Sequence, residues 1–302
     1  MLGMAIAAPP VIGTVTAGGA FRLNGDTVMA NGTLTEGAVL ESGRGNSSVR
    51  LAGGARLSLS SDSRGKLYGD RMILEKGEAR LENGVGFHLE ALGLTIRPDR
   101  GISTGRIGLL GSNRLSVAAL TGSFRVLNAR GVLVANVAAG SALAFEPQPS
   151  ADAAMTHIRG TLNQQNGRFL LTDQVTRVTV EVTGQRLAPY VGQVVGVTGA
   201  LNVAATSAAI ASQVIAATHV ETIAAGAAVA GTGGASGAAA LSVNASVVGG
   251  VSAVATAGGF GASPALSAKS QSTPAGDPPG PPVTPPGQPP GRPPVTPPGL
   301  SR

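Results

Sequence analysis

The chain has 302 residues, of which 45 are Gly and 20 are Pro, and it contains no Cys, no Trp and three His. The absence of Cys excludes disulfides, thiolate metal sites, iron–sulfur clusters and cysteine nucleophiles, and three His leave little room for acid–base chemistry. The length allows two domains of ordinary size, while the Gly and Pro content is near that of low-complexity sequence. We therefore expect part of the chain to lie outside any packed core, and we expect no catalytic, cofactor-binding or metal-binding residue.

The formal net charge of +6 is spread thinly along the chain. Residues 12–149 hold 15 basic and 11 acidic residues, residues 150–222 hold four of each, and residues 223–302 hold three and one. Arginines such as Arg22, Arg64 and Arg130 stand singly, whereas a nucleic-acid footprint needs a basic patch. The charge pattern therefore favours a dispersed, solvated surface.

Residues 1–11 are interpreted as the possible remnant of an export signal. The segment is uncharged and apolar, and Ala5-Ile6-Ala7 has the small-x-small form of a signal-peptidase site, although the basic start and the full apolar stretch of a signal peptide are missing. A strand beginning near Val11 explains the later half of the segment equally well.

Residues 12–146 predict a β-domain of many short strands. Apolar and polar residues alternate in runs bounded by Gly, Asn, Asp or Ser, which is the pattern of a half-buried antiparallel or rolled sheet. Helical periodicity is almost absent. The clearest runs are Val49–Leu51, Leu57–Leu59, Phe87–Leu89, Leu115–Val117, Phe124–Val126 and Val132–Val134.

Residues 153–222 predict a second β-domain, a small five-stranded barrel similar to an OB-fold. Two strand-like runs flank Asn166-Gly167, a strong hairpin signal. An alternating run at 177–182, one helical turn at 185–191 and two further strands at 194–199 and 212–215 complete the order of such a barrel. Its only aromatic residues are Phe169 and Tyr190, so base stacking is poorly supplied and nucleic acid is not the expected partner.

The remainder of the chain is low in complexity. Residues 223–268 are read as a spacer rich in Ala and Gly, loosely helical or without fixed structure, and residues 223–262 lack charge, so membrane association through them stays an alternative. Residues 269–302 predict a Pro-rich disordered tail. It carries Pro-Pro-Val-Thr-Pro-Pro-Gly twice, without the glycine at every third position that collagen needs.

Several segments of the first domain together resemble a known family. The segments are Gly13-Thr14-Val15, Asn24-Gly25-Asp26-Thr27-Val28, 34–43, 49–59, Leu74-Glu75-Lys76-Gly77-Glu78, Gly122-Ser123-Phe124-Arg125-Val126 and 137–143. In these turn glycines and alternating strands, about 135 residues of the chain, the sequence resembles the periplasmic FecR domain of bacterial cell-surface signalling proteins.

The resemblance implies an exported all-β interaction module, periplasmic or elsewhere in the bacterial envelope. In signalling members, one transmembrane helix joins that domain to a cytoplasmic anti-sigma segment, for which we expect no room before Gly13. The main hypothesis is a non-catalytic scaffold that binds an envelope protein or a surface polymer. The alternatives are a remnant of FecR-type sigma-factor regulation and nucleic-acid binding by the barrel. The sequence leaves the oligomeric state open.

Few residues suggest chemistry, and each has a plainer explanation. His88 and Glu90 lie on one face of a strand and could pair as base and orienting group, but a surface ion pair is the better interpretation. Proximity in sequence does not make Glu75, Glu78 and Glu82 a catalytic carboxylate pair. His157 and His219 are interpreted as residues of barrel strands. Gly231-Thr232-Gly233-Gly234 lacks the lysine and the fold context of a phosphate loop.

Overall fold

The computed structural model describes residues 9–147, 155–184, 186–202, 211–223, 245–248 and 250–256. These residues form strands, turns and one short 3₁₀ turn, with no α-helix among them, so the all-β prediction is confirmed. The expected Pro-rich tail at 269–302 and most of the expected signal remnant lie outside the described residues.

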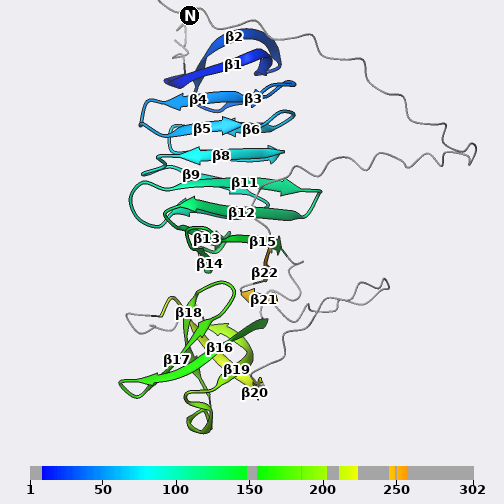
Figure 1. The fold of residues 1–302 in the computed structure, drawn as a ribbon. Helices are drawn as coiled ribbons and strands as arrows, with labels where there is room; N and C mark the ends of the chain where they lie inside the picture. The colour runs from blue at the N-terminus through cyan, green and yellow to red at the C-terminus, as the bar shows by residue number, and fades with distance from the viewer. Residues whose placement is uncertain are drawn as a thin grey trace, which may run out of the picture. The chain divides into compact units, whose positions relative to one another are not determined.

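Residues 11–147 form a roll of two facing β-layers. In Figure 1 its strands lie one above another, from β1 and β2 at the top to β13–β15 below. The chain places two strands in one layer and the next two in the other for most of the roll, so each layer is a ladder of strands distant in sequence. The first layer pairs β1 (Val11–Leu23), β4 (Ser47–Leu51), β5 (Arg56–Leu59), β8 (Glu78–Glu82), β11 (Thr104–Leu110), β12 (Arg114–Thr121) and β15 (Ala142–Pro147). The second layer pairs β3 (Ala38–Glu41), β6 (Arg64–Leu67), β7 (Arg71–Lys76), β9 (His88–Ala91), β10 (Leu94–Pro98), β13 (Phe124–Asn128) and β14 (Leu133–Val137).

The long first strand closes one end of the roll. Its first half, residues 13–17, pairs with β4, and its last two residues pair with β3, so β1 crosses from one layer to the other. The next strand, β2 (Asp26–Thr35), follows β1 through the crossing. Three residues of β1 between Thr16 and Ala20 face a single residue of β2 at the bend, which is how a bulge turns a strand.

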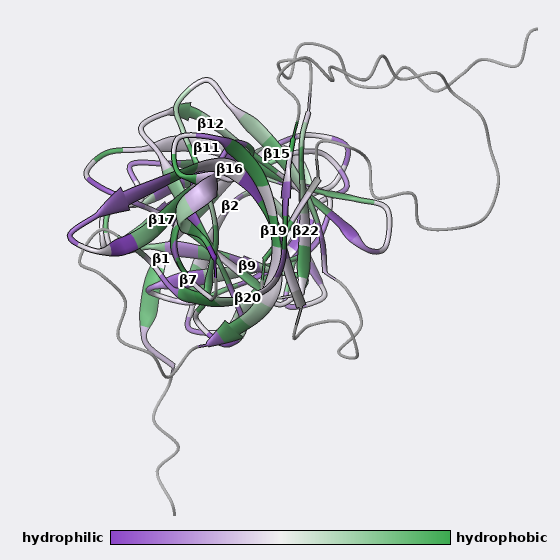
Figure 2. Cartoon of the chain, turned by 90° about the horizontal axis from the view of Figure 1, so that it is seen from below, coloured by the Kyte–Doolittle hydropathy of each residue, from purple (hydrophilic) through white to green (hydrophobic). Residues whose placement is uncertain are grey.

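The alternation seen in the sequence defines the core between the layers. Leu57 and Leu59 are buried and the residues beside them are not, because successive side chains of a strand point to opposite faces. Figure 2 shows hydrophobic and hydrophilic residues alternating along the strands. Phe124 from one layer lies directly against Gly105 of the other, where a β-carbon would collide with its ring. Each such fully buried side chain contributes about 1.5–3 kcal/mol.

Residues 155–222 form a closed five-stranded barrel. Its strands are β16 (Met155–Gln165), β17 (Arg168–Asp173), β18 (Thr179–Thr183), β19 (Val194–Asn202) and β20 (Val214–Thr222), and the turn η1 (Ala188–Tyr190) follows the third strand. Pairing runs in the order β16, β17, β18, β20, β19 and back to β16, with β18 and β20 parallel. The five strands and the turn after the third are those predicted, and Asn166-Gly167 is the hairpin turn with positive φ at both residues.

A further hairpin comes from the segment interpreted as a spacer. Strands β21 (Ala245–Val248) and β22 (Val251–Ala255) pair with each other, and β22 pairs with β15 of the roll over five residues. Val248, Val251 and Ala253 are buried. The interpretation of 223–268 as a spacer, helical or unstructured, is therefore wrong for 245–255. A strand that adds to an existing sheet can be made of small residues. Such a strand has no amphipathic pattern by which the sequence could reveal it.

Candidate binding surfaces

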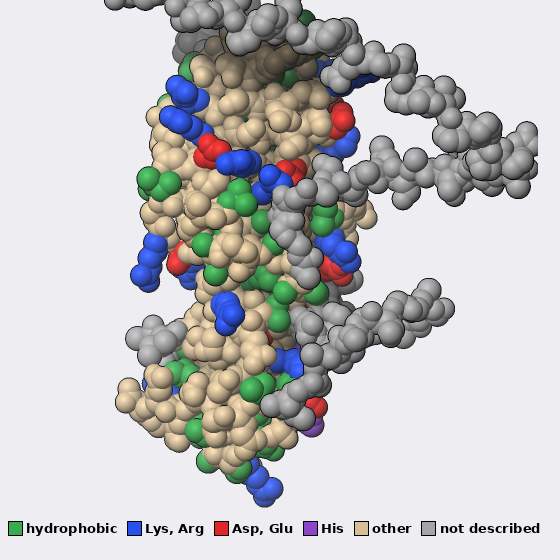
Figure 3. All heavy atoms as spheres, viewed as in Figure 1, with side chains coloured by type: hydrophobic (Ala, Val, Ile, Leu, Met, Phe, Trp, Pro, Cys, Tyr) green, Lys and Arg blue, Asp and Glu red, His purple; other side chains and the backbone are tan. Residues whose placement is uncertain are grey.

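The charged residues of the roll form pairs across its outer faces. Arg64 contacts Glu41 and Glu75, Arg106 contacts Glu78, and further pairs join Arg80 to Glu82, Arg114 to Glu146 and Arg125 to Asp99. Figure 3 shows blue and red side chains beside one another and scattered over the visible face. Exposed pairs of this kind stabilise a fold by about 0–1 kcal/mol each. The arrangement is that of the dispersed surface expected from the sequence.

The residues singled out in the roll behave as surface groups. His88 Nε2 lies 3.2 Å from Glu90 Oε1, and Arg71 Nε lies 3.7 Å from the same oxygen and stacks on Tyr68. Glu75 lies on β7, in the opposite layer from β8, which holds Glu78 and Glu82. Each of the three glutamates contacts an arginine. The structure therefore brings His88 and Glu90 together, but it does not bring the three glutamates into one site.

The residues singled out in the barrel lie on its strands. His157 on β16 is half-buried, and its Nδ1 lies 2.9 Å from Thr198 Oγ1. Desolvation by burial lowers the pKa of His157, and Glu221 opposes that shift. His219 on β20 is exposed, 3.9 Å from Glu221. Phe169 and Tyr190 are partly buried against the core. Within the described ranges, no three His, Asp or Glu residues gather as a metal site.

Both layers end at the side of the roll opposite β2, and both ends are covered. The hairpin continues the first layer beyond β15. In the second layer, Asn136 on β14 donates its backbone N–H to the carbonyl of Thr176, at 2.7 Å, and its side-chain Nδ2 to the carbonyl of Arg177, at 3.3 Å. Gln213 Nε2 donates to the carbonyl of Leu133 at the start of β14. The barrel therefore bonds to the edge of β14, and the hairpin pairs with the edge of β15.

Asp173, at the end of β17, joins the elements of this covered end. The residue is fully buried. Its Oδ1 accepts from the N–H of Val175, from the N–H of Thr176 at 2.7 Å and from the Thr176 hydroxyl at 2.8 Å. Its Oδ2 accepts from the N–H of Arg159 and from the hydroxyl of Ser246 on β21, at 2.7 Å. Five donors around one buried carboxylate fix the 174–177 loop and attach the hairpin to the barrel.

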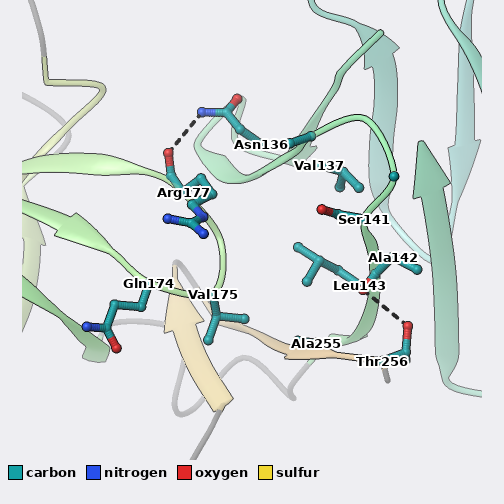
Figure 4. Close-up of a pocket in the computed structure, with 12 residues that line it drawn as sticks. Asn136, Val137, Ser141, Ala142, Leu143, Gln174, Val175, Arg177, Ala255 and Thr256 are labelled. Atoms are coloured by element: carbon teal, nitrogen blue, oxygen red, sulfur yellow. Dashed lines mark hydrogen bonds between the residues drawn. The ribbon is translucent and has the colours of Figure 1, made fainter. Parts of the chain in front are cut away.

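A groove of about 340 Å³ opens between that loop, the end of the roll and the hairpin. Its lining comes from residues 136–138 and 140–143, from Gln174, Val175 and Arg177, and from Ala255 and Thr256. Figure 4 shows Arg177 and Val175 on one side and Ser141 and Leu143 on the other. Three segments distant in sequence therefore build one concave surface, which sequence reasoning missed. The Asp173-x-x-Thr176 spacing is the only local signal for it, since Asp followed by Thr three residues on forms such a turn.

The opposite end of the roll is different, because β2 pairs with β1 alone among the described residues. Its ten residues include one charged residue, Asp26. Asn31 and Thr33 are exposed, and Met29 is 71% exposed. Ala30 has a φ of 70° at the bulge, which divides the edge into two short straight runs. An uncharged edge with free N–H and C=O groups is a template for an added strand.

No protein-family model matches the chain, and no curated protein matches it. Among the residues that the structure describes, no helix has the length and apolar character to span a membrane.

Proposed function

We propose that this chain is an exported, non-catalytic binding protein of the bacterial envelope, with a FecR-like roll as its interaction module. The observation that carries the proposal is the edge of β2. In this proposal, the roll docks an extended segment of a partner protein, which adds to β2 as one more strand. Export rests on the sequence of residues 1–11 and on the resemblance of residues 12–146.

The chemistry of β2 defines the segment that it accepts. Main-chain hydrogen bonds supply affinity in strand addition, and alternate side chains supply specificity. Thr27, Met29, Asn31 and Thr33 are exposed and uncharged, so a segment rich in β-branched and small polar residues fits better than an acidic or basic one. The partner is therefore a protein with a low-charge extended segment.

The test uses the full-length protein in its own cells, with a photo-crosslinking residue at Thr33. We expect a protein adduct there, and we expect Met29→Lys to reduce it at least about tenfold, because a lysine on an edge strand opposes strand addition. Hydrogen exchange of β2 must also slow when the captured partner is added to the purified protein. A crosslinker at Ser48, on a strand paired on both sides, is the matched control.

Three outcomes contradict the proposal. An adduct of the chain with a second copy of itself makes β2 a self-association edge. Equal adducts from Thr33 and Ser48 show contact without strand addition. If cell fractionation places the protein in the cytoplasm, the proposal of an envelope protein is wrong.

A further inference from the structure

We propose that the outer face of the first layer of the roll binds an acidic polysaccharide, through arginines that the fold brings together on neighbouring strands. The face belongs to β4, β5, β8 and β11, each of which pairs with a strand on both sides. It is separate from the open edge of β2, so the proposal goes beyond the proposed function and does not rest on it.

Arg50 on β4 and Arg56 on β5 stand directly opposite each other. Both are exposed on the outer face, because Leu57, the next residue after Arg56, is buried in the core. Like charges directly opposite each other destabilise a sheet. Among the described residues, no Asp or Glu forms an ion pair with either arginine, since Glu82, opposite Arg56 on β8, contacts Arg80 at 2.9 Å. The fold therefore concentrates positive charge at this point.

The absence of an acidic contact distinguishes this pair from similar ones. Elsewhere in the described strands, Lys or Arg residues stand opposite each other at Arg80 and Arg106, at Arg97 and Arg125, and at Arg64 and Lys76. At least one member of each of those pairs contacts an Asp or Glu. Within the described part of the chain, Arg50 and Arg56 are thus the opposed pair whose charge no ion pair balances, and that charge is available to an anionic ligand.

The arginines continue over the next two strands of the same face. Arg80 on β8 lies opposite Ser58 of β5 on one side and opposite Arg106 of β11 on the other. In Figure 1 these strands lie one below another, from β4 to β11. Neighbouring strands are about 4.8 Å apart, so arginines on four of them span roughly 15 Å. That length exceeds a single small anion and suits a linear chain with repeated negative groups.

The other side chains of this face favour a sugar polymer over a nucleic acid or a peptide. Thr14, Ser48 and Ser58 lie beside the arginines and carry hydroxyl groups suited to bonding with sugar hydroxyls. The phenylalanines of the roll are buried and Tyr68 follows β6 of the second layer, so the face offers no ring on which a base could stack. Because each strand is paired on both sides, a peptide cannot add to it as a strand.

A polymer of uronic acids supplies the groups that the arginines bind. Such a chain carries one carboxylate on every ring, and a ring is about as long as the spacing between neighbouring strands, about 5 Å. A guanidinium binds a carboxylate through two parallel hydrogen bonds. A chain lying across β4, β5, β8 and β11 therefore meets an arginine on each strand, and its strongest contacts are at Arg50 and Arg56, where no acidic residue competes.

The test measures binding of polygalacturonate to the full-length protein by titration calorimetry. Three further probes separate the features of the ligand. The fully methyl-esterified polymer lacks the carboxylates, monomeric galacturonate lacks the repeat, and inorganic polyphosphate lacks the sugar hydroxyls. We expect saturable binding of polygalacturonate, at least about tenfold weaker binding of the monomer, weaker binding of polyphosphate and no binding of the ester. Amide chemical shifts are expected to change in β4, β5 and β8.

Arg50→Gln together with Arg56→Gln is expected to weaken polygalacturonate binding at least about tenfold, because hydrogen bonds to a charged group are lost. Arg97→Gln together with Arg125→Gln is the matched control. It removes the same charge from an opposed pair in the second layer and is expected to leave binding unchanged. The chemical shifts of the free variants show whether each remains folded. Equal binding of the ester or the monomer, tighter binding of polyphosphate, or an equal effect of the two double variants would each overturn the proposal.

Discussion

The two ends of the roll treat their edge strands in opposite ways. At one end β2 pairs only with β1 among the described residues, and its exposed residues are uncharged. At the other end β15 is continued by β22, and β14 is bonded by the 174–177 loop and Gln213. Proteins normally protect exposed sheet edges because free N–H and C=O groups invite pairing. The contrast between the two ends is the reason for proposing that a partner docks at β2.

The hairpin that covers β15 comes from a segment distant in the sequence. About a hundred residues separate β15 from β22, so the chain must close a long loop before the pairing forms. Loop-closure entropy grows only slowly with length, and burial of Val248, Val251 and Ala253 offsets it. A distant hairpin is therefore a physically reasonable way to cover an edge.

The largest expected effect at the covered end is that of Asp173→Ala. The substitution removes the acceptor of five hydrogen bonds and leaves buried N–H and hydroxyl donors without a partner. We expect the free energy of unfolding to fall by about 4 kcal/mol, measured by urea denaturation. Asp26→Ala, at the exposed start of β2, is the control and is expected to change stability by less than about 0.5 kcal/mol. If Asp173→Ala lowers the free energy of unfolding by less than about 1 kcal/mol, Asp173 does not join the hairpin to the barrel as described.

Ala253→Asp is expected to open the covered end without unfolding the roll. Ala253 is fully buried opposite Phe145, and an unpaired carboxylate there costs several kcal/mol, which detachment of the hairpin avoids. Hydrogen exchange should accelerate at Leu143–Phe145, and size-exclusion chromatography should show self-association through the uncovered β15. Ser252→Asp, on the less buried face of the same strand, should change neither property. Unchanged exchange in β15 would show that the hairpin is not its cover.

The smallest expected effect is the pH dependence due to His157, which faces Val247 of the hairpin. Burial lowers the pKa of His157 below 6.5 in the folded protein, so the unfolded chain binds the proton more readily. The stabilisation is therefore complete above pH 6.5 and is lost as the pH falls through the folded pKa. Because the imidazole is half-exposed, we expect less than about 1 kcal/mol. His157→Gln should flatten the decline in the urea midpoint between pH 7.5 and 5.5, and an identical decline in both proteins would contradict the assignment.

The individual strands and turns could be predicted because each has a local sequence pattern. Alternation at 49–51, 57–59 and 124–126 places one face of each strand in a core, and Asn166-Gly167 identifies a hairpin from two residues. The hairpin at 245–255 could not be predicted, because Ala, Ser and Val carry no pattern that separates a strand from a spacer. The groove could not be predicted either, since its lining depends on which distant segments meet.

The sequence by itself determined that the described part of the chain is all-β, that five barrel strands follow one another with a turn after the third, and that the charges are dispersed. These follow from local rules of side-chain alternation and turn chemistry, which need no knowledge of distant residues. Only the tertiary structure decided which edge lacks a second partner among the described residues, where the 245–255 hairpin docks and that Ser246 of the hairpin bonds to Asp173 of the barrel. Those depend on pairings between residues tens of positions or more apart, and hydrogen bonding between backbones is almost independent of the side chains that a sequence displays.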